Sequence, residues 1–242
     1  MPPVQSAVRL AKRIMDLAGS AVGLGLTLPL YPVIAAAIRL DSPGPIFYRQ
    51  RRAAGYPDAE GDAARVPVFH MLKFRTMRQD AEKGTGAVLA QAGDPRVTRV
   101  GRFLRKTRLD ELPQFWNVLR GEMSIVGPRP ERPELLVPLS AAVPFFEERM
   151  RGVKPGITGL AQINLDYAGR MSQSSPLWVH RDELINPFRL EGIEDSEADD
   201  MRTKMLYDFA YAASLERFWN FLRTDAEIIA RTPLVMVFGR GR

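Results

Sequence analysis

The chain has 242 residues, a formal net charge of +6 and a sequence pI near 9.8. This length suits one packed domain, and the basic balance indicates an anionic partner such as phosphate, nucleic acid or an acidic lipid surface. Cysteine is absent and the two histidines, His70 and His180, are far apart, which argues against disulfides, thiolate metal sites, zinc chemistry and histidine triads.

An apolar segment near the N-terminus gives the strongest membrane signal. Residues 17–38 carry no charged side chain, and a helix of about 20 such residues crosses a bilayer core. Pro29 and Pro32 interrupt the segment, and proline breaks the helical hydrogen-bond ladder. Basic residues flank both ends, so a helix that re-enters the same side keeps all of them on the cytoplasmic face. We therefore predict a re-entrant helix-break-helix over residues 1–40, with the Thr27 hydroxyl as a partner for the broken backbone.

The same apolar segment could instead be a buried core helix or a cleaved signal peptide. A buried core helix has the same composition, although few small domains bury so long an uncharged run. A signal peptide would be followed by a cleavage site of small residues, whereas the sequence that follows here is DSPGPIFYRQRR. Both alternatives stay open.

Residues 41–242 are predicted to form one domain that lies on the membrane interface. Two short strands at 45–52 and 67–77 are expected to pair as an antiparallel hairpin. The basic, amphipathic segment 96–109 is expected either to contact an anion or a lipid headgroup layer or to form a helix with one solvated face. Aromatic residues beside arginines after Met201 suit a membrane interface or, more commonly, a core. The predicted fold class is α/β and predominantly helical.

The most informative segment, 105–131, contains adjacent acids. Four apolar residues recur at helical spacing and predict the buried face of a helix that ends at Gly121: Leu112, Phe115, Trp116 and Leu119. Pro113 is tolerated only in the first turn of that helix, which places Asp110 and Glu111 at its N-terminus. The helix dipole and free N–H groups there favour negative charge, so Asp110 should stay ionised.

Two adjacent carboxylates need a cation before a diphosphate can approach them, and Mg²⁺ commonly lies between carboxylates and substrate phosphates. One carboxylate, Asp110, could attack phosphorus while its neighbour Glu111 holds the metal. Arg129 lies between Pro128 and Pro130, which restrict its backbone and favour a fixed phosphate clamp. The alternative is structural: the acids cap a helix and Arg129 pairs with a carboxylate such as Glu131.

Several motifs in this order resemble the bacterial sugar transferase family, the monotopic polyprenyl-phosphate phosphoglycosyl transferases. The resemblance covers most of the chain and is carried by Lys12-Arg13 with Asp16, the proline-broken apolar helix, GPIFYRQ at 44–50, KFRTM at 73–77, the block from Asp94 to Pro130, KPGITGLAQIN at 154–164, and Tyr207-Asp208 with Tyr211. So many long motifs in the right order make the match specific.

The resemblance implies a two-step transfer of a sugar 1-phosphate from a UDP-sugar to polyprenyl (undecaprenyl) phosphate, with release of UMP, which initiates glycoconjugate assembly. It assigns Asp110 as the nucleophile of a covalent intermediate and Glu111, with Asp110, as the Mg²⁺ site. Arg105 and Arg129 match phosphate-contacting positions, and we add Lys73 and Arg75 from KFRTM as candidate phosphate ligands. Family members lie on the cytoplasmic face of the bacterial inner membrane.

The chain also departs from the family. Many members have Ser-Pro at the helix break, whereas this chain has Leu28-Pro29, and residues 170–203 match weakly and are predicted to form a variable loop near the sugar site. A non-catalytic basic membrane-surface adaptor is the alternative function. Nucleic-acid binding rests on net charge alone and is not expected. The donor sugar, the pathway and the choice between a single chain and a homodimer stay open.

Overall fold

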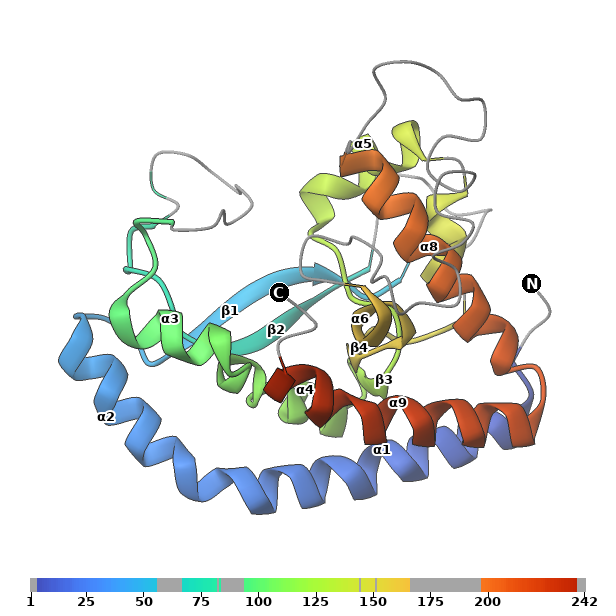
Figure 1. Ribbon diagram of the computed structural model, residues 1–242, viewed down its shortest axis with the longest axis horizontal. Coiled ribbons are helices and arrows are strands. Elements are labelled where there is room, and N and C mark those ends of the chain that lie inside the picture. The colour runs from blue at the N-terminus through green and yellow to red at the C-terminus, as the bar shows by residue number, and fades with distance from the viewer. Residues whose placement is uncertain are drawn as a thin grey trace.

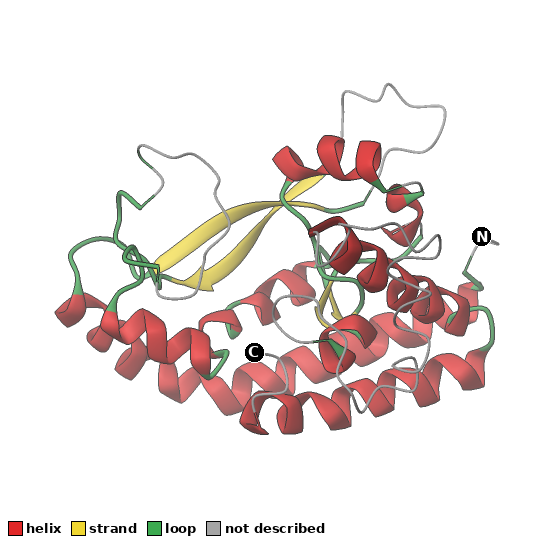
Figure 2. Cartoon of the chain, turned by 45° about the horizontal axis from the view of Figure 1, so that its top comes forward, coloured by secondary structure: helices red, strands yellow, loops and turns green. Residues whose placement is uncertain are grey.

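The computed structural model describes residues 4–55, 67–81, 83, 94–143, 145–150, 152–165 and 197–238. Within these residues the protein is mostly helical, with two small two-stranded sheets (Figures 1 and 2). The helices are α1 (Ser6–Thr27), α2 (Tyr31–Asp41), α3 (Arg99–Lys106), α4 (Gln114–Arg120), α5 (Pro133–Ala142), α6 (Leu160–Asn164), α8 (Glu197–Ser214) and α9 (Phe218–Phe238), with 3₁₀ turns η1 (Leu28–Leu30), η2 (Leu109–Glu111) and η3 (Phe146–Met150). The predicted helical α/β character is confirmed, and most of the predicted loop at 170–203 lies outside the described residues.

The N-terminal apolar segment forms one long, bent helix that runs from α1 through η1 to α2. It is long and apolar enough to cross a membrane: an 18-residue stretch of it has a mean hydropathy of 1.9, and only 22% of that stretch is buried in the protein. The bend falls at Leu28–Leu30, because Pro29 and Pro32 cannot donate to the helical ladder. The Thr27 hydroxyl donates to the Gly23 carbonyl at 2.7 Å, within α1. It therefore does not serve the carbonyls of Gly25 and Leu28, four residues before Pro29 and Pro32. Figure 1 shows a shallow arc whose two ends turn toward the rest of the protein, rather than a tight hairpin.

The basic residues near the start of α1 do not all face outward, which corrects part of the charge argument. Lys12 pairs with Asp225 of α9 at 2.8 Å, and Arg13 donates to the carbonyls of Val118 and Leu119 at the end of α4. These contacts take both cations away from a headgroup layer. The case for membrane contact therefore rests mainly on the exposed apolar side chains.

Those apolar side chains form a surface along α1, η1 and α2. Its members include Leu40 at 89%, Leu26 at 75% and Val33 at 69%, together with Leu10, Ile14, Val22, Leu28 and Leu30. Trp219 on α9 is also 75% exposed, and α9 lies alongside α1 in both views (Figures 1 and 2). Large contiguous apolar surfaces of this kind indicate contact with a membrane or a partner.

The predicted antiparallel hairpin is confirmed. Strand β1 (Phe47–Ala53) pairs with β2 (Val68–Phe74), and Tyr48 lies opposite Lys73. Phe69, Met71 and Phe74 of β2 point into cores shared with α2, α3 and α4. Lys73 leaves this hairpin toward η2, where the adjacent acids lie.

Helix α4 presents the opposite face from the one predicted. Its buried residues are Gln114, Asn117 and Val118, whereas Trp116 is 44% exposed. Asn117 explains why this face is buried, because its side chain accepts a hydrogen bond from Leu72 N and donates one to the His70 carbonyl. Phe115 turns toward α1 instead, where its ring lies against Gly23.

The strand pair β3 (Ser124–Val126) and β4 (Gly156–Thr158) is parallel and sits at the centre of the largest core cluster. Helix α1 fixes β3 through Asp16, whose carboxylate accepts from the Ser124 hydroxyl and from Ile125 N, both at 2.8 Å. Helix α8 and helix α9 complete the core with Tyr211 and Phe221. The C-terminal aromatic residues thus divide between core and surface.

Candidate active site

The adjacent acids Asp110 and Glu111 lie in the 3₁₀ turn η2 rather than in the first turn of α4. Pro113 occupies the N-cap of α4, which begins at Gln114. The residue before η2, Arg108, has a left-handed backbone with φ +58°. A non-glycine residue in that region is strained, and such strain is common at functional sites. Both acids are buried, at 6% and 8% exposure.

Glu111 is held by three cations. Its Oε1 accepts from Arg129 at 2.8 Å and from Lys73 at 3.2 Å, and it lies 4.0 Å from Arg108. Burial alone would raise the pKa of Glu111, but Arg129, Lys73 and Arg108 hold that pKa well below its usual range. Glu111 is therefore ionised and fixed in position.

Asp110 has a different environment. Its buried Oδ1 has no hydrogen-bond partner within the described residues. Burial raises the pKa of Asp110 to about 6, the nearby Glu111 charge adds to the rise, and Lys73, Arg105 and Arg108 oppose it. The expected stabilisation by a helix dipole is wrong, since α4 begins only at Gln114 and the pKa of Asp110 is raised. Asp110 is still mostly ionised near neutral pH.

Four cations surround the acids from separate elements. Lys73 comes from β2, Arg105 from α3, Arg108 from the turn before η2 and Arg129 from the segment after β3. Arg105 Nε donates to the Thr76 hydroxyl at 2.9 Å, which orients its guanidinium. Burial lowers the pKa of Lys73, while Glu111 and Asp110 counteract that effect. The structure thus brings together every predicted phosphate ligand except one.

The exception is Arg75. Its guanidinium donates to the carbonyls of Ser42 and Pro43 and to the Ser42 hydroxyl, at 2.6 to 3.0 Å. These groups follow the C-terminus of α2, where exposed carbonyls require donors. Arg75 therefore holds the end of the apolar helix, and its assignment as a phosphate ligand is corrected. Alternation along a strand would place Lys73 and Arg75 on the same face. The two side chains diverge because β2 ends at Phe74, before Arg75.

Sequence reasoning missed a second buried charge cluster that supports this site. Arg149, 2% exposed, pairs with Asp208 at 2.8 Å and with Glu131 at 3.5 Å. Its Nη2 also donates to the Arg129 carbonyl at 2.9 Å. The Tyr207-Asp208 motif was a signal for one partner, whereas Arg149 lies in the charged stretch FEERM, which resembles a solvated surface. The structural alternative paired Arg129 with a carboxylate such as Glu131. Arg129 does bind a carboxylate, that of Glu111, while Glu131 pairs with Arg149.

The acids also fit a hard divalent cation. No group of three or more acidic or histidine side chains able to hold a metal occurs in the described part of the chain. Two adjacent carboxylates are nevertheless sufficient for Mg²⁺ when substrate phosphates and water supply the other ligands. Asp110 Oδ1 is unsatisfied and can serve, whereas Glu111 already uses Oε1 for two cations and would have to bind through its other oxygen.

Comparison with known proteins shows which proteins the chain is similar to. A family model described as "Bacterial sugar transferase" matches residues 7–239. The chain is 36% identical over 231 residues, 95% of its length, to a UDP-N-acetylgalactosamine-undecaprenyl-phosphate N-acetylgalactosaminephosphotransferase of Aeromonas hydrophila. It is 45% identical over 162 residues, 67% of its length, to a UDP-glucose:undecaprenyl-phosphate glucose-1-phosphate transferase of Caulobacter vibrioides.

A third relative is named as a putative undecaprenyl-phosphate N-acetylgalactosaminyl 1-phosphate transferase of Bacillus subtilis (strain 168) and is 45% identical over 141 residues, 57% of this chain and 72% of that protein. The matched regions make up 44% of the Aeromonas protein and 57% of the Caulobacter protein. The chain thus spans about half the length of two of these relatives. Their names also specify two different sugars.

Proposed function

The chain belongs to the bacterial sugar transferase family, and from this premise we propose that it transfers a sugar 1-phosphate from a UDP-sugar to polyprenyl phosphate, with Asp110 as nucleophile. The observation that carries the proposal is the contrast within the acid pair. Glu111 is neutralised and locked by cations, whereas Asp110 is buried beside the same cations with a free oxygen. A carboxylate with a free oxygen and neighbouring cations is suited to attack a phosphorus atom.

In the first step, an Asp110 oxygen attacks the sugar-bearing phosphorus of the UDP-sugar. The bond between that phosphorus and the bridging oxygen breaks, and UMP leaves with the bonding electrons. In the second step, a phosphate oxygen of polyprenyl phosphate attacks the same phosphorus. The aspartyl–phosphorus bond then breaks, the Asp110 carboxylate is restored, and a polyprenyl diphosphate sugar is released.

The surrounding cations have a clear role in both steps. Lys73, Arg105, Arg108 and Arg129 reduce the repulsion between the carboxylates and a diphosphate, and they are positioned before substrate arrives. Arg129 offers a planar fork of donors to phosphate oxygens. Mg²⁺ held by Asp110 and Glu111 would supply additional charge neutralisation. We place the reaction on the cytoplasmic face of the bacterial inner membrane, where the exposed apolar helix surface would be embedded.

UMP release tests this proposal. The purified protein in detergent or nanodiscs is given polyprenyl phosphate, Mg²⁺ and separate UDP-sugars, including UDP-glucose, UDP-galactose and UDP-N-acetylgalactosamine. We expect one donor to give acceptor-dependent UMP release, and Asp110→Asn to reduce it by about 10³-fold or more. Glu227→Gln, on an exposed face of α9, is the control and should be unchanged.

A second readout identifies the intermediate. Incubation with donor but without acceptor should add the mass of a phosphosugar to the peptide that contains Asp110. Activity that survives in Asp110→Asn would refute the nucleophile. Membrane binding without UMP release from any donor would favour the non-catalytic adaptor.

A further inference from the structure

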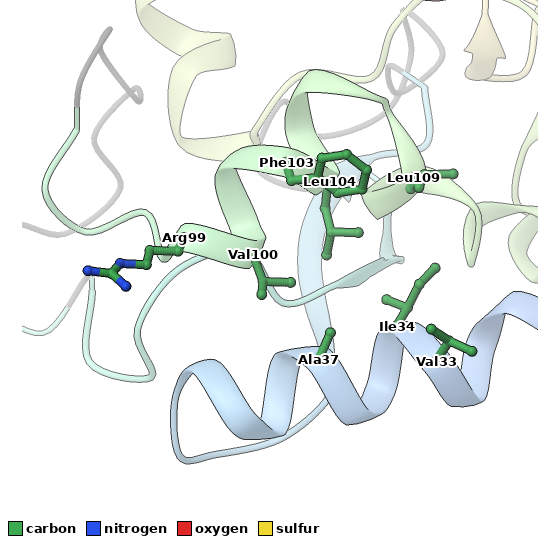
Figure 3. A pocket seen from close by; sticks show the side chains of 8 residues that line it. All are labelled: Val33, Ile34, Ala37, Arg99, Val100, Phe103, Leu104 and Leu109. Atoms are coloured by element: carbon green, nitrogen blue, oxygen red, sulfur yellow. The ribbon is translucent and has the colours of Figure 1, made fainter.

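An apolar pocket of about 390 Å³ lies between α2 and α3 (Figure 3). Val33 and Ala37 line it from α2, Val100, Phe103 and Leu104 line it from α3, and Leu109 of η2 lies at one end. We propose that this pocket holds the first isoprene units of the acceptor lipid, with the phosphate end directed past Leu109 toward Asp110. This inference rests on the proposed function, since it names where one of its two substrates binds.

One side of the pocket communicates with the apolar surface of the protein. Val33 is 69% exposed and Phe103 is 58% exposed, and both also line the pocket. Val33 lies on the helix surface that carries Leu28 and Leu30, so the pocket and the expected lipid layer are continuous. A lipid chain can therefore enter sideways from the bilayer, without crossing water.

The other end of the pocket is lined by Leu109, the residue before Asp110. Leu109 and Asp110 are neighbours in η2, so the end of the pocket lies one residue from the proposed nucleophile. Arg105 follows directly after the pocket residues Phe103 and Leu104 on α3, and its charge acts on Asp110. A chain seated in the pocket would present its terminal phosphate to these cations.

The chemistry of the lining selects a hydrocarbon occupant. Apart from Arg99, the side chains that line the pocket are apolar, and an apolar cavity offers water few hydrogen-bond partners. Burial of a hydrocarbon chain there is favourable by about 25 cal/mol for each Å² of apolar surface removed from water. In Figure 3, Arg99 lies at the end of the pocket opposite Leu109. The apolar lining therefore fits a hydrocarbon chain that enters sideways past Val33 and Phe103 and carries its reactive group beyond Leu109.

Filling the pocket provides the test. Ala37→Phe places a ring in the pocket, and its matched control, Ala36→Phe, places the same ring on the exposed face of α2. The acceptor is polyprenyl phosphate in nanodiscs, and the donor step is followed separately by exchange of labelled UMP into UDP-sugar without acceptor. We expect Ala37→Phe to raise the KM for the acceptor about tenfold, with exchange within about threefold of the native rate, and Ala36→Phe to change neither.

The two proposals fail in different ways. Absence of UMP exchange in the native chain contradicts the two-step function, whereas normal exchange with an unchanged acceptor KM in Ala37→Phe overturns the pocket assignment. A photoreactive isoprenoid phosphate applied to the native chain gives a measurement that does not depend on a variant. Labelling within α2 or α3 supports the pocket, and labelling confined to other elements, or labelling abolished by phospholipid alone, overturns it.

Discussion

Two buried charge clusters meet at Arg129, and they differ in how completely their polar groups are paired. In the first, the Arg129 guanidinium binds Glu111, and the neighbouring Asp110 keeps an oxygen without a partner in the described part of the chain. In the second, Arg149 donates to Asp208, to Glu131 and to the Arg129 carbonyl. Both clusters pair arginine with carboxylates, and the first also contains Lys73.

The difference indicates which cluster reacts and which supports. An unsatisfied buried oxygen is costly and is retained where it has a function, whereas a satisfied buried pair fixes the backbone around it. Burial raises the pKa of Asp208 as it does that of Asp110, so a raised pKa alone is not diagnostic. The free oxygen, together with the opposite pKa shifts of Asp110 and Glu111, marks the first cluster as the reactive one.

The largest predicted effect is the loss of the supporting pair. Arg149→Met leaves Asp208 buried without its partner, and breaking a buried pair costs about 3–5 kcal/mol. We expect a large fall in thermal stability in detergent. The double variant Arg149→Met with Asp208→Leu should recover much of the loss, because the charge that was buried on α8 is then removed as well.

An exposed pair provides the control for this prediction. Arg231 and Glu227 are 3.1 Å apart on α9 and are both more than 40% exposed. Arg231→Met should therefore change stability by no more than about 0.5 kcal/mol. Equal effects of the two arginine variants would contradict the supporting role of Arg149.

The next prediction separates the two adjacent acids by the sign of their effect on stability. Ionised Asp110 is destabilising because its pKa is raised from 3.8 to about 6 on folding, which corresponds to about 3 kcal/mol. Asp110→Asn should therefore stabilise the protein by about 2–3 kcal/mol near pH 8. Glu111→Gln should destabilise it by about 1–3 kcal/mol, because Arg129 and Lys73 lose a charged partner.

The sign of the predicted effect of Asp110→Asn on stability can be checked by varying the pH. A carboxyl group whose pKa is raised by folding lowers the free energy of unfolding. This loss of stability is absent at pH values below the group's pKa in the unfolded state, and it is complete at pH values above its pKa in the folded state. The advantage of Asp110→Asn should accordingly shrink as pH falls from about 8 to 4, measured by thermal unfolding. Destabilisation by Asp110→Asn at high pH would mean that its oxygen has a partner in solution.

Much of the local structure could be predicted from the sequence, since it depends on local patterns. Two short strand-like stretches at 45–52 and 67–77 indicated the hairpin, and Pro29 and Pro32 located the bend of the apolar helix. The meeting of Asp110 and Glu111 with Lys73, Arg105 and Arg129 followed from motif order and family resemblance. The buried face of α4 could not be found in this way, because the polar Asn117 is buried to bond a strand far away in the sequence.

The wrong prediction for Arg75 and the failure to identify Arg149 have the same physical origin. Lys73 and Arg75 are equivalent in a pattern of spaced cations, yet only tertiary contacts send one to Glu111 and the other to the end of α2. Arg149 could not be recognised because its partner Asp208 lies 59 residues away. Pairings over such distances depend on how helices pack, and periodicity carries no information about them.

A smaller effect is predicted for Tyr211, which fixes the strand before Arg129 from the other side. Its hydroxyl lies 3.1 Å from the Val126 carbonyl and 3.0 Å from Asp225 Oδ1, and it can donate to one of them at a time. Tyr211→Phe keeps the ring and should cost about 1–2 kcal/mol of stability. UMP release at low temperature should remain within a few fold of native. Loss of activity without loss of stability would show that Tyr211 acts on the reaction itself.

The smallest predicted effect concerns the pH dependence of the native chain. Only ionised Asp110 can attack phosphorus, and its pKa of about 6 predicts that kcat/KM for the donor falls to about half at that pH. The slope should approach tenfold per pH unit at lower pH. Lys73→Gln removes a charge that lowers the pKa of Asp110, so its acid limb should move to higher pH. UMP release across pH measures both profiles. An acid limb that stays in place in Lys73→Gln would mean that another group controls the titration, whereas a shifted limb would connect the rate to the carboxylate whose free oxygen distinguishes the two clusters.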